Sequence, residues 1–99
     1  MKFEVLNDRR PEGSLKGTIR ASYHELCDLF GEPRKGDGYK TDVEWDIEFE
    51  DGTYATIYNW KNGPAWCGEG SVNNIDVWNV GGKTIEALFR VEEVFDGEI

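Results

Sequence analysis

The sequence predicts an α+β fold: an antiparallel sheet of three to five strands with two amphipathic helices packed on one face. In residues 42–50 acidic and apolar residues alternate, which is the period-two pattern of a half-buried strand. Asp51-Gly52 and a run rich in β-branched and aromatic residues (53–60) follow, and together they predict a hairpin. Apolar residues at helical spacing mark helices at 23–30 and 84–95.

Length and charge limit the classes of function. The 99 residues predict one domain, residues 1–99, with a single core. Eleven basic and twenty acidic residues give a net charge of −9, which disfavours direct binding to nucleic acid or to an anionic membrane and favours a basic protein surface. Two cysteines, no signal-peptide pattern and no apolar run of membrane-spanning length lead us to expect a cytoplasmic protein.

Both expected helices have sequence signals at their ends. Ser22 and Glu25 form a capping-box pattern, and Gly31 with Pro33 predicts the end of the first helix. Its apolar face comprises Tyr23, Leu26, Cys27 and Phe30. For the second helix the expected apolar stripe is Ile85, Leu88, Phe89 and Phe95.

The remaining segments complete the sheet. Residues 2–6 and 15–21 are expected to be extended, and 34–40 a loop. Residues 61–74 form a long expected loop, of the length that is often functional. A last strand is expected at 75–80, ended by two glycines.

The hairpin carries the main candidate surface. A two-residue turn at Asp51-Gly52 would pair Glu50 with Thr53 and Phe49 with Tyr54, so that the rings of both strands share one face. The other face would then show five carboxylates about 6.8 Å apart, with no cation on the second strand to neutralise them. These are Asp42, Glu44, Asp46, Glu48 and Glu50. The row is either a solvated face that keeps the chain soluble or a surface that binds a basic partner.

Sequence motifs for catalysis and metal binding are weak. Residues 80–84, Val-Gly-Gly-Lys-Thr, lack the first glycine of a phosphate-binding loop, although two glycines beside Lys83 at a helix start could receive an anion. His24 and Cys27 lie at helical i, i+3 spacing without a third orienting group, and the cysteines have no metal-ligand spacing. We therefore expect a protein without enzymatic activity, cofactor or metal.

Short segments of the chain resemble a group of small tailed-bacteriophage proteins. The shared features are a Trp-containing strand before an acidic-Gly turn, an Ile-Tyr-x-x-Lys segment and a Trp-x-x-Gly-Gly motif before the last helix. In this sequence they are residues 45–49, 57–61 and 78–82, and the resemblance covers about residues 22–91. It implies a small protein made in an infected bacterium, and such proteins often inhibit a host enzyme or defence complex.

Two hypotheses for function follow. The first is a non-enzymatic phage-type inhibitor that presents the acidic row as a nucleic-acid mimic to a basic host protein, such as a nuclease or CRISPR-type effector, with Trp60, Lys61 and Trp66 at the rim. The second is a sponge for a small nucleotide-like ligand, with an oligomer closing the cavity. Its ligand would lie against Trp60, Trp66 or Trp78 and against Gly81, Gly82, Lys83 and Thr84.

Overall fold

The computed structural model describes residues 1–9 and 13–97, which form an α+β fold as the sequence predicts. Its sheet is antiparallel, with the strand order β1-β4-β5-β6-β2, and a short strand β3 pairs with β4 beside β1. The strands are β1 (Phe3–Leu6), β2 (Ser14–Arg20), β3 (Arg34–Lys35), β4 (Val43–Phe49), β5 (Tyr54–Tyr58) and β6 (Val77–Gly82). The sheet is thus one strand larger than expected, because β3 forms inside the expected loop 34–40.

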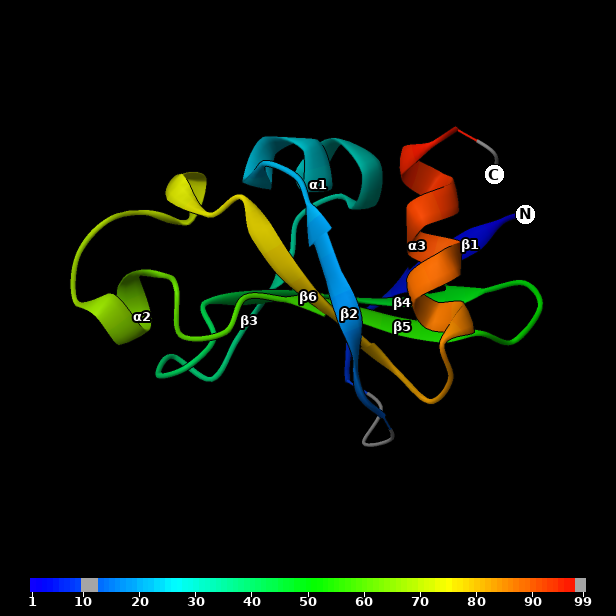
Figure 1. The fold of residues 1–99 in the computed structure, drawn as a ribbon, viewed down its shortest axis with the longest axis horizontal. Helices are drawn as coiled ribbons and strands as arrows, with labels where there is room; N and C mark the ends of the chain where they lie inside the picture. The colour runs from blue at the N-terminus through cyan, green and yellow to red at the C-terminus, as the bar shows by residue number, and fades with distance from the viewer. Residues whose placement is uncertain (10–12, 98–99) are drawn as a thin grey trace.

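Two longer helices cover one face of the sheet. Helix α1 (Tyr23–Phe30) and helix α3 (Glu86–Phe95) lie on the same side of it (Figure 1). The segment 61–74, expected to be a loop, contains the one-turn helix α2 (Pro64–Cys67) and a 3₁₀ turn (Val72–Asn74). No helix of the described residues lies over the opposite face of the sheet, which we call the uncovered face.

Aromatic residues of the sheet form much of the core under the two helices. Trp45 and Trp78 are fully buried, with their ring centroids 5.6 Å apart. The indole nitrogen of Trp45 donates to the carbonyl of Gly31 at 2.8 Å, and that of Trp78 donates to Ala21 at 2.9 Å. Both buried N–H groups are therefore satisfied, which removes the main cost of burying tryptophan.

Helix α1 begins and ends where the sequence predicts. The Ser22 hydroxyl accepts from the Glu25 amide, and the Glu25 carboxylate accepts from the Ser22 amide, both at 3.0 Å. Gly31 then takes a positive φ of 79°, which ends the helix. Leu26 and Phe30 of this helix are buried in the same core as Trp45. The capping box thus stabilises the start of a helix that covers the core.

The hairpin register differs by one residue from the prediction. The Gly52 amide donates to the Phe49 carbonyl and the Phe49 amide to the Thr53 carbonyl, which closes a three-residue loop with Gly52 at φ +88°. Glu48 therefore pairs with Tyr54, not Phe49 with Tyr54. One extra loop residue moves every side chain of β5 to the other face. As a result the tyrosines of β5 share the uncovered face with the acidic residues of β4.

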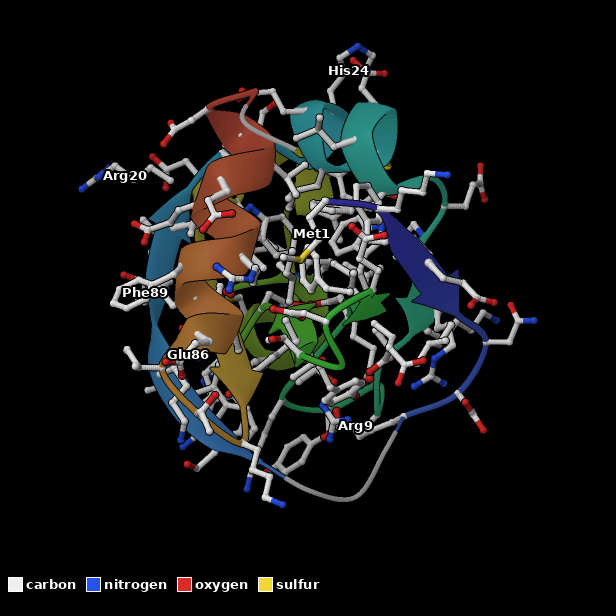
Figure 2. The ribbon with its side chains drawn as sticks, turned by 90° about the vertical axis from the view of Figure 1, so that its right-hand side faces the viewer. Met1, Arg9, Arg20, His24, Glu86 and Phe89 are labelled. Carbon is white, nitrogen blue, oxygen red and sulfur yellow. The ribbon has the colours of Figure 1, made fainter. Side chains whose placement is uncertain are left out.

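Strand β6 and helix α3 also differ from their expected form. The strand continues through Gly82, and the helix starts at Glu86. Ile85 and Phe89, expected in the apolar stripe, are 44% and 47% exposed, and Phe89 points away from the sheet (Figure 2). Ala87, Val91 and Val94 are buried instead. The small Ala87 faces the sheet because the helix passes so close to Gly82.

Candidate functional site

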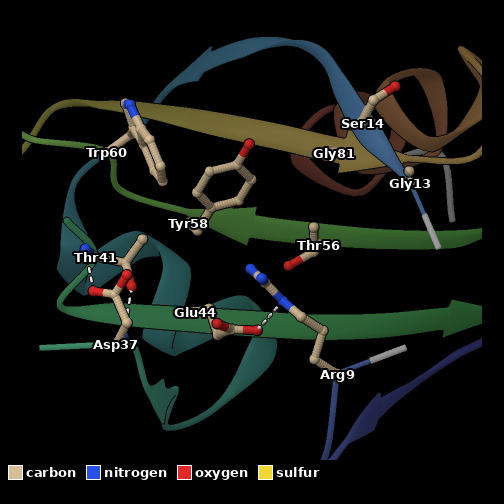
Figure 3. Close-up of a pocket in the computed structure, with 11 residues that line it drawn as sticks. Arg9, Gly13, Ser14, Asp37, Thr41, Glu44, Thr56, Tyr58, Trp60 and Gly81 are labelled. Atoms are coloured by element: carbon tan, nitrogen blue, oxygen red, sulfur yellow. Dashed lines mark hydrogen bonds and ion pairs between the residues drawn. The ribbon is translucent and has the colours of Figure 1, made fainter. Parts of the chain in front are cut away.

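Chain topology brings two arginines onto the uncovered face. Strands β1 and β2 are at opposite edges of the sheet, so the chain between them has to pass from one edge to the other. Arg9 lies on this connection and reaches the middle of the face (Figure 3). Arg34 lies on β3, directly beside Glu44 of β4.

These arginines neutralise the centre of the acidic row. The Glu44 carboxylate accepts from Arg9 Nε at 3.0 Å and from Arg34 at 2.9 Å. Asp46 accepts from Arg34 Nε at 2.9 Å and from the Tyr54 hydroxyl at 2.7 Å. Glu44 is 6% exposed and Asp46 is fully buried. Burial raises the pKa of Glu44, and the carboxylate of Asp46 raises it further, although the two guanidinium groups oppose this.

The expected exposed row of five carboxylates is therefore wrong. Asp42 accepts from the Asn59 side chain and from the Ala65 amide, both at 2.9 Å, so it holds the start of α2 in place. Glu48 is half-buried, and Glu50 is exposed. The hairpin alone could not show this, because both arginines come from segments outside it.

A pocket of about 220 Å³ opens on the uncovered face (Figure 3). Its floor is formed by Thr56 and Gly81, which pair across β5 and β6. Tyr58 and Trp60 form one wall, with ring centroids 6.5 Å apart and ring planes at 86°. The other lining residues are Arg9, Gly13, Ser14, Asp37, Thr41, Glu44 and Gly82.

The Thr56 hydroxyl is an unsatisfied polar group in this pocket. Thr56 is only 9% exposed, and its oxygen has no hydrogen-bond partner among the described residues. Figure 3 shows this oxygen turned toward the side of Arg9 and Glu44. A buried hydroxyl without a partner costs about 1–3 kcal/mol. The position of the Thr56 hydroxyl in a pocket therefore makes it a candidate contact for a ligand.

Exposed rings and lysines lie next to the pocket. Tyr39, Trp60 and Trp66 are 58%, 45% and 42% exposed. The ammonium group of Lys40 lies 5.4 Å from the Trp60 ring centroid, and that of Lys61 lies 5.9 Å from it and 4.8 Å from that of Trp66. We call these five residues the aromatic–lysine cluster. Trp60, Lys61 and Trp66, the rim residues of the first hypothesis, lie in this cluster, and their role in binding a partner stays a prediction.

Asp37 fixes the loop that carries part of this cluster. Its Oδ1 accepts from the amides of Tyr39, Lys40 and Thr41 at 2.8, 2.8 and 2.9 Å. These hydrogen bonds favour the ionised carboxylate and lower the pKa of Asp37 to about 2.

We expect acid to weaken this loop. Because the folded pKa of Asp37 is about 2, below its usual 3.8, its contribution to stability is present above pH 3.8 and is lost as pH falls toward 2. In Asp37→Asn the free energy of unfolding should therefore decrease less between pH 7 and pH 3 than in the wild type. Urea denaturation of both proteins at pH 7 and pH 3 measures it, and an equal loss of stability in the two proteins would contradict it. Asp51, whose pKa is also about 2, is unchanged in both.

The residues of the second hypothesis are only partly brought together. Gly81, Gly82 and Trp60 line the pocket, but Trp78 is fully buried in the core and cannot contact a ligand. Lys83 and Thr84 are exposed and precede α3 without lining the pocket. The expectation of a helix N-terminus directly after the glycines is wrong, because α3 begins at Glu86. Trp66 lies beside the pocket, in the cluster.

Sequence reasoning missed the pocket residues Arg9, Thr56 and Tyr58. Thr56 and Tyr58 were placed on the wrong face by the register error. Arg9 gave no local signal, since its role depends on the strand order.

Other chemical groups are not organised around this site. Within the described part of the chain, no three His, Cys, Asp or Glu side chains are grouped to hold a metal ion. None of the helices in residues 1–9 and 13–97 has the length and apolar character needed to cross a membrane. His24 is exposed and lies 3.4 Å from Asp28 rather than being part of a cleft.

Comparison with known proteins does not assign the chain to a family: no family model, curated protein or solved structure matches it. The resemblance to bacteriophage proteins stays a prediction.

Proposed function

We propose that the protein is a non-enzymatic binding protein that holds a small planar ligand of nucleobase type in the pocket of the uncovered face. The observation that carries this proposal is the Thr56 hydroxyl, which is buried, turned into the pocket and without a partner among the described residues. A ligand edge that hydrogen-bonds to it would remove the cost of its burial.

The other walls favour a flat ligand with both donors and acceptors. Tyr58 and Trp60 offer two ring surfaces at right angles, so a planar group against one ring meets the edge of the other. Arg9, whose guanidinium carbon lies 5.9 Å from the Tyr58 ring centroid, supplies N–H donors, and Glu44 supplies acceptors. The volume of about 220 Å³ is below the roughly 300–1,000 Å³ of sites for drug-sized ligands, which favours a single ring system.

Thr56→Val tests this proposal. It removes the hydroxyl with almost no change of shape, so we expect the free protein to become more stable by up to about 1 kcal/mol. Binding of the ligand should become about tenfold weaker, because one hydrogen bond is lost. Thermal-shift titration with nucleosides and nucleotides measures both effects, since a ligand at 100 times its Kd stabilises by about 2.7 kcal/mol.

Thr56→Ser is the matched control, because it keeps the hydroxyl and should keep most of the affinity. If no nucleoside or nucleotide raises the melting temperature, or if Thr56→Val binds as well as the wild type, the proposal is wrong.

A second candidate function is inhibition of a protein partner, and the exposed rings of the aromatic–lysine cluster favour it. Tryptophan and tyrosine are typical anchors of protein interfaces, and the net charge of −9 would steer a basic partner toward the chain. This phage-type inhibitor would use Tyr39, Trp60 and Trp66 rather than the neutralised acidic row.

Trp66→Ala separates the two functions, because Trp66 belongs to the cluster but does not line the pocket. We expect it to reduce capture of a protein partner from an infected bacterial extract at least tenfold if an interface anchor is lost. Nucleoside binding should be unchanged. Glu50→Ala, at an exposed acidic position outside the pocket, is the control for capture. Equal capture by wild type and Trp66→Ala would argue against the inhibitor function.

A further inference from the structure

We infer that the ligand carries an anionic phosphate group held by Lys40 and Lys61, so that the pocket binds a nucleotide rather than a free base. This inference rests on the proposed function and adds the second half of the ligand. Trp60 makes the connection, because it lines the pocket and also has both lysine ammonium groups near its ring.

The two lysines are held beside each other by the backbone. The Lys61 amide donates to the Lys40 carbonyl at 2.8 Å, which ties the loop before β4 to the segment after β5. Their ammonium groups lie 5.4 and 5.9 Å from the same Trp60 centroid. A ligand whose ring lies against Trp60 would therefore have its extension close to two cations.

Neither lysine forms an ion pair with a carboxylate of residues 1–9 or 13–97. Among the described residues no carboxylate lies within 4.0 Å of either ammonium group, although the chain has twenty acidic residues. Counting Asp37 and Glu44 of the pocket against Arg9 and these two lysines leaves one net positive charge here. Lysine is a common phosphate ligand, so this local excess in a strongly acidic protein favours an anionic group.

Lys61 also has an uncommon backbone conformation. Its φ of 57° makes it the one non-glycine residue with positive φ among the described residues, a conformation that is unfavourable for a residue with a Cβ. Glycine or asparagine would be tolerated more easily there. Strained backbone conformations cluster at binding sites, and the positive φ of Lys61, next in sequence to the pocket residue Trp60, supports a role for Lys61 in binding.

The test is calorimetric titration with purine and pyrimidine nucleosides, their 5′-monophosphates and inorganic phosphate. We expect the best monophosphate to bind about tenfold or more tightly than its nucleoside, and this advantage to shrink at higher salt. Lys40→Gln combined with Lys61→Asn should abolish the advantage, so that the double variant binds nucleoside and monophosphate with equal affinity. Asparagine is chosen because it tolerates positive φ.

Lys83→Gln is the control, because Lys83 is exposed and does not line the pocket. It should keep the full preference for the monophosphate. If nucleoside and monophosphate bind equally well, or if the double variant keeps the preference, the inference is overturned while the proposed function stands. If neither nucleosides nor monophosphates bind, both are overturned. Binding of inorganic phosphate alone, without binding of any nucleoside, would also overturn both.

Discussion

Replacing Asp46 with alanine is expected to lower the free energy of unfolding by about 3 kcal/mol. Removal of one partner from a buried ion pair typically costs 3–5 kcal/mol. Here it leaves Arg34 Nε and the Tyr54 hydroxyl without the acceptor they use at 2.9 and 2.7 Å. We expect the lower end of the range because the Arg34 side chain is 31% exposed and water can reach it. A domain of this size is stable by only about 5–15 kcal/mol, so the loss should be large in urea denaturation.

Glu50→Ala is the matched control from the same acidic row. Glu50 is exposed, so its replacement should change stability by less than about 0.5 kcal/mol. A small effect of both substitutions would show that Asp46 is accessible, and it would restore the acidic row as a candidate binding surface. A large effect confined to Asp46 would mean that the acid at this position serves the fold.

The hairpin shows where sequence reasoning succeeds and where it stops. Alternation correctly placed Trp45, Ile47 and Phe49 in the core, because the period of a strand is a local property. The turn sequence does not determine the length of the hairpin loop. Asp51-Gly52 is compatible with a two-residue turn and also with the three-residue loop that forms. The register of the hairpin determines which face of the sheet each residue of β5 occupies. Because the predicted loop was one residue too short, Thr56 and Tyr58 were predicted on the core face and were not included in the candidate site.

The electrostatic character of the uncovered face depended on topology. Period-two alternation places Glu44 and Asp46 on one face, but it carries no information about Arg9 and Arg34, which reach that face from other segments. By contrast, the contacts that Lys61 makes with Trp60 and Trp66 join residues that lie close together in the sequence. Contacts between distant segments are the part of the site that required the three-dimensional structure.

Alanine substitutions at the two adjacent glycines of β6 should affect different properties, because successive residues of a strand face opposite sides of the sheet. Gly82→Ala should mainly lower stability, and Gly81→Ala should mainly weaken ligand binding. At Gly82 an added Cβ would lie 2.4 Å from the Cβ of Ala87 and 2.9 Å from the Tyr54 carbonyl oxygen, so helix α3 would have to move off the sheet. We expect Gly82→Ala to lower the free energy of unfolding by about 2–3 kcal/mol, as overpacking of a core does.

At Gly81 the added Cβ would lie 3.1 Å from Cγ2 of Thr56 and 3.5 Å from the Tyr58 ring, on the floor of the pocket. These side chains can shift slightly, so Gly81→Ala should cost less than about 1 kcal/mol of stability. Ligand binding should nevertheless fall at least tenfold, because the added methyl group takes up space on the pocket floor beside Cγ2 of Thr56. Urea denaturation and thermal-shift titration of both variants measure the two effects. A Gly81→Ala protein that is stable and still binds nucleotide normally would place the ligand elsewhere. Equal stability of Gly82→Ala and wild type would contradict the close contact between α3 and β6.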